Sequence, residues 1–296
     1  MSRTKTRTIP FLIAAAATIL FIGIGQAGHA QTPEPSNSGV PASVDPKFKP
    51  RLGTYYYKFD YNNVSIGIAS ISINRENDLY KIQVLAQTND SIDRIYKIRY
   101  RGESLMEAEP GIASVKTKTQ QQVKAKEKDM TIQFNENGEI KSIEKETEKG
   151  GTVDYKVRRL MPEKFTVDPF AATYLVRGLD WKVGLEEVFD VYGGKRRYEL
   201  TLRCSHIQGV DVEGTKRPAY VIIPTVKKLD DEGNVVESSK KPADTKIYLS
   251  ADQNKDVLKI EASHTLGLFR VTLDRFVPLV RQEAAAPAKE GPKTGN

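Results

Sequence analysis

The chain has 296 residues, a mean hydropathy of −0.46 and a formal net charge of +7. It has no Arg-rich patch interleaved with aromatic side chains, so the basic charge does not indicate a nucleic-acid-binding protein. A single cysteine, Cys204, excludes an internal disulfide, and the fold must therefore depend on the burial of apolar side chains.

The N-terminal segment has the three-part pattern of a secretory signal peptide. Arg3, Lys5 and Arg7 precede an apolar run over Ile9–Gly25, and a small-x-Ala site follows at Gly28–Ala30. The run is short for a bilayer core of about 30 Å, and no cysteine for lipid attachment stands at the cut. We therefore expect cleavage after residue 30 and a periplasmic location, with a retained N-terminal anchor as the alternative.

Composition divides the rest of the chain into three parts. Residues 31–50 are rich in proline and serine, which is typical of a flexible linker. Residues 281–296 are rich in Ala, Pro, Gly and Lys, which predicts a disordered tail. The segment between them, residues 51–280, is expected to form a single β domain.

Apolar and polar residues alternate through most of this domain. The pattern is clear over Tyr80–Val84, Tyr96–Tyr100 and Met130–Phe134, and Asn137–Gly138 then supplies a turn. Side chains on a strand point alternately to opposite faces, so the pattern predicts many half-buried strands. The expected fold is mainly β: an antiparallel curved sheet or barrel-like domain with one short covering helix.

One strand changes its apolar face along its length. Val64, Ile66 and Ile68 share one parity, whereas the apolar residues of Ala69–Ile73 share the other. Such a switch beside Gly67 indicates a β-bulge or a sharp bend that helps a sheet to curl.

Lysines alternate along the segment Val115–Lys128, which we interpret as one long strand. The basic face is one hypothesis for attachment to an anionic surface; the alternative is a solvated outer face or protection of a sheet edge. The residues of this candidate surface are Lys116, Lys118, Lys124, Lys126 and Lys128.

One helix is predicted after residue 167. Asp168 is a suitable N-cap, Pro169 fits the first helical position and Gly178 ends the helix. Its apolar stripe either packs against the sheet or, with Trp181, lines a ligand cavity. The candidate lining residues are Phe170, Tyr174 and Trp181.

Motifs of catalysis are missing from the sequence. It has no Gly-rich phosphate loop, no metal-ligand spacing and no Gly-x-Ser-x-Gly elbow, and two Ser-x-x-Lys matches lie in charged, turn-like segments. Cys204 continues a period-two apolar pattern and is expected to be a buried core residue; its proximity to His206 is interpreted as coincidence. We therefore expect no enzyme, no catalytic residues, no cofactor and no metal.

The body of the chain resembles the bacterial domain of unknown function 3108 family. The segments that carry the resemblance are Gly53–Tyr57, Asp168–Arg177, Leu179–Gly184, Lys246–Asp252 and Thr265–Leu268. The chain departs from the family where Tyr248 stands, since a Trp is frequent there. The resemblance implies an exported, largely β protein without assigned catalytic residues; at the level of fold, its curved sheet is similar to the half-barrels of periplasmic lipoprotein carriers.

Three functions are consistent with these observations. The first is a non-enzymatic envelope protein that holds a lipid or other amphipathic ligand inside the curled sheet. The second is an interaction or structural protein that binds an anionic envelope glycan or lipid through the basic strand face. The third is a cell-wall-acting enzyme, which requires two carboxyl groups about 5–9 Å apart in a cleft. No nucleic acid and no membrane span after cleavage are expected, and the oligomeric state is left open.

Overall fold

The computed structural model describes residues 44–45, 48–108, 113–148, 150–236, 244–264 and 267–279. The predicted signal peptide (1–30) and tail (281–296) lie outside this part of the chain, as does most of the predicted linker. The end of that linker belongs to the fold, because Val44 pairs with Leu179 and the Asp45 amide donates to the Gly178 carbonyl.

The described residues form one sheet of 16 strands, with the order β8-β7-β6-β5-β4-β3-β2-β1-β16-β15-β14-β12-β11-β10-β9 and β13 beside β12. Neighbours are antiparallel, except that β9 and β10 are parallel. The strands are β1 (Gly53–Tyr61), β2 (Val64–Glu76), β3 (Leu79–Thr88), β4 (Ile98–Glu107), β5 (Ser114–Val123), β6 (Lys126–Phe134), β7 (Ile140–Thr147), β8 (Val153–Leu160), β9 (Thr166–Val167), β10 (Glu186–Tyr192), β11 (Arg197–Val212), β12 (Thr215–Leu229), β13 (Val235–Val236), β14 (Asp244–Ser250), β15 (Val257–His264) and β16 (Gly267–Pro278).

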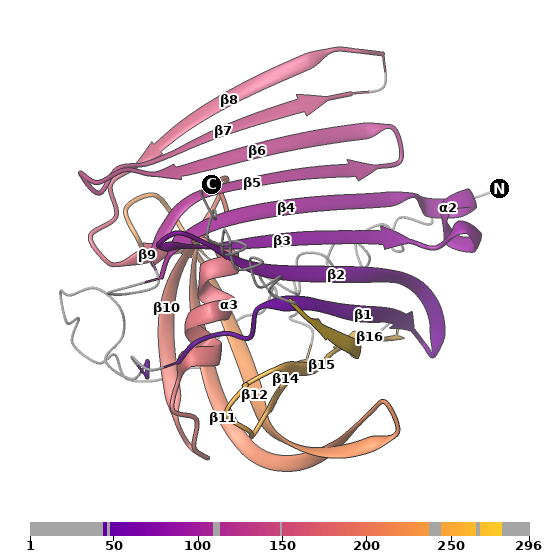
Figure 1. Ribbon diagram of the computed structural model, residues 1–296. Helices are drawn as coiled ribbons and strands as arrows, with labels where there is room; N and C mark the ends of the chain where they lie inside the picture. The colour runs from indigo at the N-terminus through magenta and orange to yellow at the C-terminus, as the bar shows by residue number, and fades with distance from the viewer. Residues whose placement is uncertain are drawn as a thin grey trace, which may run out of the picture.

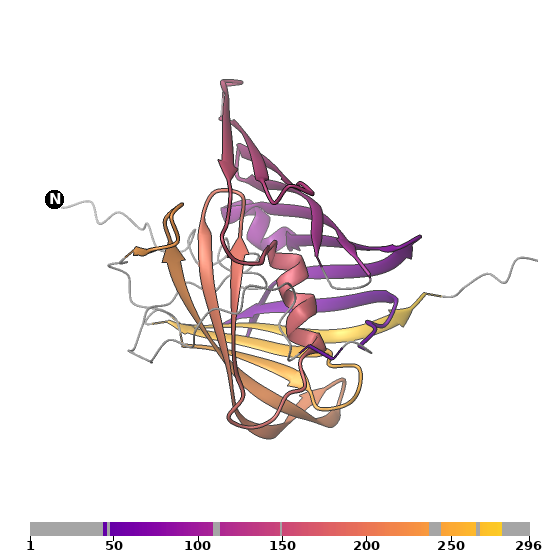
Figure 2. The ribbon, with the colours of Figure 1, turned by 90° about the vertical axis from the view of Figure 1, so that its left-hand side faces the viewer.

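The sheet curls around helix α3 (Pro169–Gly178), which lies in its concavity (Figures 1 and 2). The predicted mainly β, barrel-like fold is confirmed. In the described residues, no backbone pairing joins β8 to β9 or β10. Side chains connect the two ends instead: the Ser142 hydroxyl on β7 lies 2.9 Å from the Tyr192 hydroxyl on β10 and donates to the Gly194 carbonyl at 2.6 Å.

The predicted irregularity in β2 is a β-bulge. The pairing of β1 with β2 changes register between Phe59 and Asp60, which leaves Ile66 as the extra residue. At Gly67, a Cβ atom would lie 2.4 Å from the Gln87 carbonyl oxygen of β3. Only glycine allows the neighbouring backbone to approach so closely at this bend.

The concave face is filled by side chains. Tyr55, Tyr57 and Phe59 alternate inward from β1 and are buried against residues of α3 and the later strands. Cys204 is buried and unpaired, as predicted, and burial raises the pKa of its thiol. His206 is exposed, because the register of β11 on β12 shifts between Cys204 and His206.

A second helix, α2 (Asp90–Tyr96), corrects the prediction of a single helix and of a strand that includes Tyr96. Asn89 caps it, since its side-chain oxygen accepts the Ile92 amide hydrogen at 3.1 Å. The strand β4 begins only at Ile98. The alternation of Tyr96, Ile98 and Tyr100 is therefore continuous in sequence but crosses a helix–strand boundary.

The predicted long strand Val115–Lys128 is instead a hairpin. Strand β5 ends at Val123 and β6 begins at Lys126, with Lys124 at a φ of 58° in the turn. Because the two-residue turn reverses the chain, even-numbered residues face outward in β5 but odd-numbered residues face outward in β6.

Helix α3 is anchored at its N-terminus by a buried carboxylate. One Asp168 oxygen accepts the Phe170 amide at 2.7 Å, and the other accepts the hydroxyls of Ser104 at 3.1 Å and Ser114 at 2.6 Å. These serines lie on β4 and β5. At Gly102 on β4, a Cβ atom would lie 2.4 Å from the Phe170 ring, so glycine lets the helix pack directly on the strand.

Replacement of Asp168 tests this anchor. Asp168→Ala removes the N-cap and leaves two buried serine hydroxyls without their acceptor, so we expect the free energy of unfolding to fall by about 3 kcal/mol. Urea denaturation measures the change. The exposed neighbour Asp180 gives the control, since Asp180→Ala is expected to cost no more than about 0.5 kcal/mol. Equal effects of the two variants would contradict the anchoring role.

A buried ion-pair cluster joins β6, β7 and β8 on the concave side. Glu144 is 1% exposed and pairs with Lys128 and with Arg158, the latter at 2.9 Å. Burial acts to raise the pKa of Glu144, but the two cations outweigh it and lower the pKa to about 2. The carboxylate is therefore more acidic in the folded than in the unfolded chain.

This shift predicts how stability depends on pH. The pKa of Glu144 is lower in the folded state, so its stabilisation is present above about pH 4.5 and is lost as the pH falls towards 2. The loss is up to about 3 kcal/mol. In urea denaturation, Glu144→Gln should be less stable than the parent at pH 7, with the difference shrinking towards pH 3. Comparing the variant with the parent at each pH cancels the pH dependence that other groups contribute to stability. One of these groups is Asp168, whose pKa is raised and whose contribution has the opposite sign. A difference that does not change with pH would contradict this assignment.

Candidate functional site

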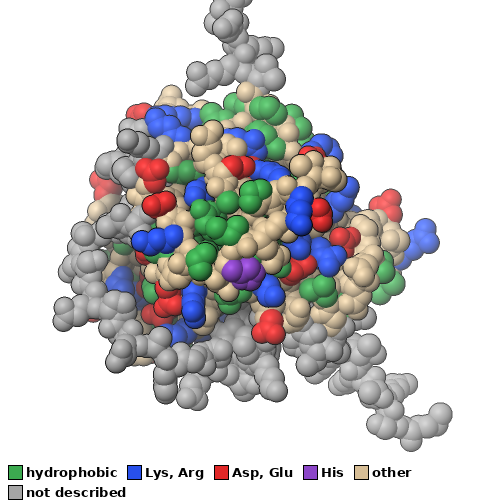
Figure 3. Space-filling view, turned by 90° about the horizontal axis from the view of Figure 1, so that it is seen from below, with side chains coloured by type: hydrophobic (Ala, Val, Ile, Leu, Met, Phe, Trp, Pro, Cys, Tyr) green, Lys and Arg blue, Asp and Glu red, His purple; other side chains and the backbone are tan. Residues whose placement is uncertain are grey.

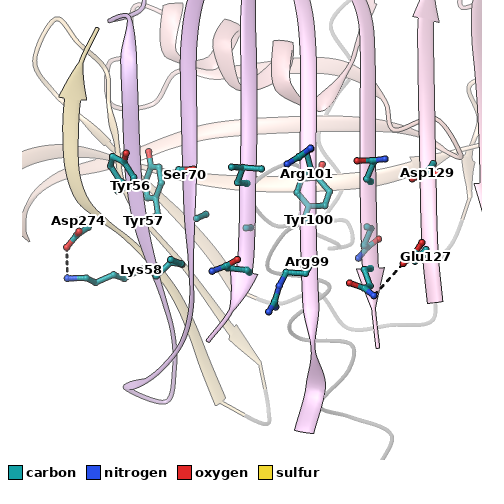
Figure 4. Close-up of a pocket in the computed structure, with 18 of the residues that line it drawn as sticks. Tyr56, Tyr57, Lys58, Ser70, Arg99, Tyr100, Arg101, Glu127, Asp129 and Asp274 are labelled. Atoms are coloured by element: carbon teal, nitrogen blue, oxygen red, sulfur yellow. Dashed lines mark hydrogen bonds and ion pairs between the residues drawn. The ribbon is translucent and has the colours of Figure 1, made fainter. Parts of the chain in front are cut away.

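A groove of about 640 Å³ crosses the outer face of the sheet from β16 to β6 (Figure 4). Its floor consists mainly of two cross-strand rows, which the strand pairing brings together from distant parts of the chain. The first row is Tyr56, Ser70, Leu85, Arg101, Gln120 and Asp129; the second is Lys58, Ile68, Gln87, Arg99, Gln122 and Glu127. Both point away from α3, because their parity is opposite to that of the buried residues.

Apolar side chains in the groove are unusually open to solvent. Ile68 is 52% exposed and Leu85 is 48% exposed, and they lie on adjacent strands. The Tyr56 ring lies beside them on β1, with the Arg275 guanidinium 4.1 Å from its centroid. This stacking holds the aromatic side chain in place at one end of the groove.

Most cations of the groove are balanced by carboxylates. Lys58 and Arg275 both pair with Asp274, and these cations lower the pKa of that carboxyl. Arg99 pairs with Asp93 of α2, and hydrogen bonds from Arg99 and Thr88 lower the pKa of Asp93 to about 2. The groove therefore has fixed charges but little excess of either sign along this part.

The far end of the groove is rich in amides. Gln120 and Gln122 lie on the outward face of β5, and Gln122 donates to Glu127 at 3.5 Å. A carboxamide both donates and accepts hydrogen bonds, whereas a guanidinium only donates and a carboxylate only accepts. This end of the groove therefore offers both donors and acceptors of hydrogen bonds. Arg101 adds a further donor, and the described residues provide no ion pair for it.

A much smaller cavity lies in the interior. A cavity of about 40 Å³ lies between α3 and the sheet, and both Phe170 and Tyr174 line it. Trp181 does not; it is buried and donates from its indole nitrogen to the Val176 carbonyl at 2.8 Å. A cavity of this size suits water rather than an acyl chain.

The five predicted surface lysines do not form one strip. Lys116 and Lys118 face outward beside the groove but do not line it. Lys124 lies in the turn, 4.9 Å from the Tyr96 ring centroid. Lys126 and Lys128 point to the concave side, where they pair with Glu146 and Glu144. The hairpin turn is the reason, and the basic face is therefore divided between two sides of the sheet.

Charge is also mixed on the face of the molecule that lies at the bottom of Figure 1. Figure 3 shows Lys and Arg interspersed with Asp and Glu over the face seen from below. In the described part of the chain, no group of three His, Cys, Asp or Glu side chains is placed to hold a metal ion. None of its helices has the length and apolar character required to cross a bilayer.

The groove has no contiguous signature in the amino-acid sequence. Its two rows are ordinary outward-facing positions of six consecutive strands, and only the strand register places them side by side. The only local signal is the pair Gln120 and Gln122, which alternation places on one face of β5.

The fold defines a class of mainly β protein in which one curled, largely antiparallel sheet surrounds a helix. The family model described as "Protein of unknown function (DUF3108)" matches residues 56–274, and the chain belongs to that family. The predicted resemblance is thus confirmed. A search of curated proteins gives no match.

Solved structures similar to this chain have low sequence identity. A β-barrel-like protein of the domain of unknown function DUF1849 from Brucella abortus is 12% identical, with a TM-score of 0.47 over 78% of this chain and 98% of that one. A protein from Bacteroides fragilis with a YmcC-like fold, described provisionally as exported, is 7% identical. Its TM-score is 0.28 over 80% of this chain and 100% of that one. These likenesses are too distant to transfer a function.

The two interior tyrosines provide a prediction about the small cavity. Within the described structure the Tyr174 hydroxyl is buried without a hydrogen-bond partner, whereas the Tyr55 hydroxyl donates to Asp256 at 2.9 Å and accepts from Arg177 at 3.0 Å. Tyr174→Phe removes no hydrogen bond to another described residue and should change stability by less than about 1 kcal/mol. Tyr55→Phe should lower it by about 2 kcal/mol, because buried charged groups lose a partner.

Thermal and urea denaturation of both variants measure these changes. The two substitutions remove the same atom, so each serves as the control for the other. A larger loss of stability at Tyr174 than at Tyr55 would contradict the assignment.

Proposed function

We propose that this chain is an exported, non-enzymatic cell-envelope protein that binds an envelope polysaccharide in the outer groove. The single observation that carries the proposal is the groove itself: two cross-strand rows in which exposed apolar side chains alternate with amides and charged groups. The predicted signal peptide supports the location in the periplasm.

The lining favours a sugar over an acyl chain. A pyranose ring has apolar C–H faces and a rim of hydroxyl groups that both donate and accept hydrogen bonds. Tyr56, Ile68 and Leu85 offer surface for the faces, and the amides of Gln120 and Gln122 can serve the rim. A lipid chain would cover these amides and charges without offering them hydrogen-bond partners, which is costly.

The balance of charge favours a polysaccharide with little net charge. Lys58, Arg275 and Arg99 already have carboxylate partners, so an anionic polymer gains little from them. Binding in the groove should consequently depend weakly on salt. Attachment through Lys116 and Lys118 would instead weaken strongly with salt, because exposed charges are screened within about 10 Å at 0.1 M.

The enzyme alternative has less support. Glu127 and Asp129 lie two residues apart on the same face of β6, and both line the groove. A pair of catalytic carboxyls needs two different environments, one of them apolar. Neither of these side chains is buried, and we therefore propose binding without hydrolysis.

Calorimetric titration tests the proposal. The mature chain is titrated with β-1,4-linked N-acetylglucosamine oligomers and with dextran oligomers, and separately with phosphatidylglycerol vesicles. We expect binding of an oligosaccharide that is retained at 0.5 M NaCl. Tyr56→Ala and Gln120→Ala should each weaken it about tenfold, a change of about 1.4 kcal/mol.

Lys118→Ala is the matched control, since Lys118 is on the same face of β5, two residues from Gln120, but outside the groove. It should bind as the parent does. Binding to vesicles but to neither oligosaccharide, or an equal loss in the Lys118 variant, would contradict the proposed function.

A further inference from the structure

We propose that strand β8 is a self-association surface, through which two copies of this chain join their sheets edge to edge. The inference concerns a different part of the molecule from the groove and does not depend on the function proposed for it. β8 lies at one end of the sheet and pairs with β7 on one side; on its other side no strand of the described residues pairs with it (Figure 1).

From Val153 to Val157 the outer face of β8 is apolar although it is open to solvent. Val153 is 43% exposed, Tyr155 is 63% exposed and Val157 is 57% exposed. Ile143 on β7, opposite Val157, extends the patch. An open edge with free backbone donors and acceptors beside such a patch is a template for pairing with another strand.

The sequence of β8 is complementary to itself. If two copies pair antiparallel with Tyr155 on the twofold axis, Tyr155 faces its own copy and each Val153 faces a Val157 of the other chain. Aromatic and β-branched pairs of this kind stabilise neighbouring strands. A twofold axis requires such self-complementarity, because the same surface serves both copies.

The other face of β8 has matching charges. In the same register, each Asp154 faces a Lys156 of the second copy, which gives two opposite-charge pairs. Within a single chain these two side chains pair with one another at 2.8 Å and are largely exposed, at 59% and 52%. They are therefore free to exchange that contact for one across the axis. Moving the twofold axis from Tyr155 to Lys156 would shift the register by two residues and place Lys156 against its own copy, whereas an axis at Tyr155 opposes no like charges.

Opposite residues of paired strands point to the same side of the sheet, so the two outer faces form one continuous surface. The two grooves then open to the same side of the dimer. A long polymer can occupy both at once, and a second binding event within one complex raises the overall affinity.

Cysteine cross-linking tests the register. Opposite Cα atoms in antiparallel strands are about 4.5–5.5 Å apart, within the range for a disulfide. Tyr155→Cys should therefore form a disulfide-linked dimer under mild oxidation. Val157→Cys should not, because its own copy lies about 13 Å away along the strands. The parent chain is the control, since its single cysteine, Cys204, is buried.

Charge variants test the interface without a covalent bond. Asp154→Lys alone and Lys156→Asp alone each create like-charge pairs, and each should raise the dimer dissociation constant at least about tenfold. An equimolar mixture of the two variants should form a heterodimer with about the parent affinity, which also shows that both variants fold. Sedimentation velocity measures the species present.

A monomeric parent chain at 100 μM would overturn the proposal, as would cross-linking at residue 157 without cross-linking at residue 155. Failure of the variant mixture to associate while the parent is a dimer would place the interface elsewhere and would also overturn it. None of these results bears on oligosaccharide binding by the monomer, so this proposal and the proposed function fail separately.

Discussion

Helix α3 connects the two halves of the curled sheet through one charged residue at each end. Asp168 is bound to serines of β4 and β5, whereas Arg177 donates to Tyr55 of β1 and to Asp256, beside β15, at 3.1 Å. Both charged groups are almost fully buried. Burial raises the pKa of Asp168 in spite of its hydrogen bonds, which means that the carboxylate is held there at a cost. The arrangement selects one position of the helix more than it adds stability.

A helix held in this way determines where a ligand can bind. Its apolar side chains and those of the inward strand positions pack into the concavity, and a cavity of about 40 Å³ lies between them. The larger space, about 640 Å³, lies on the opposite face of the same strands. Each strand from β1 to β6 thus contributes alternate residues to the core and to the groove. A change of register in any one of them would disturb both.

Much of the fold was predictable because it follows from local rules. The alternation of apolar residues predicted the strands, and Asp168 with Pro169 predicted the start of α3. The parity switch predicted a bulge or bend beside Gly67, and the bulge lies at Ile66. Two predictions failed for an equally local reason. The turn at Lys124 and the helix ending at Tyr96 interrupt alternating patterns without a Gly or Pro to mark the break. Since period-two parity carries no record of chain reversal, the lysines were assigned to one face.

The sequence by itself determined the class of fold, the family, the buried state of Cys204 and the helix with its cap, because each depends on residues close together in the chain or on their type. The groove and the interior depended on the tertiary structure. Tyr56 and Asp129 become parts of one row only through the pairing of six strands, and each pairing depends on the register of the one before it. The size of the interior cavity likewise depends on how closely α3 packs on Gly102, a contact between residues that are far apart in sequence.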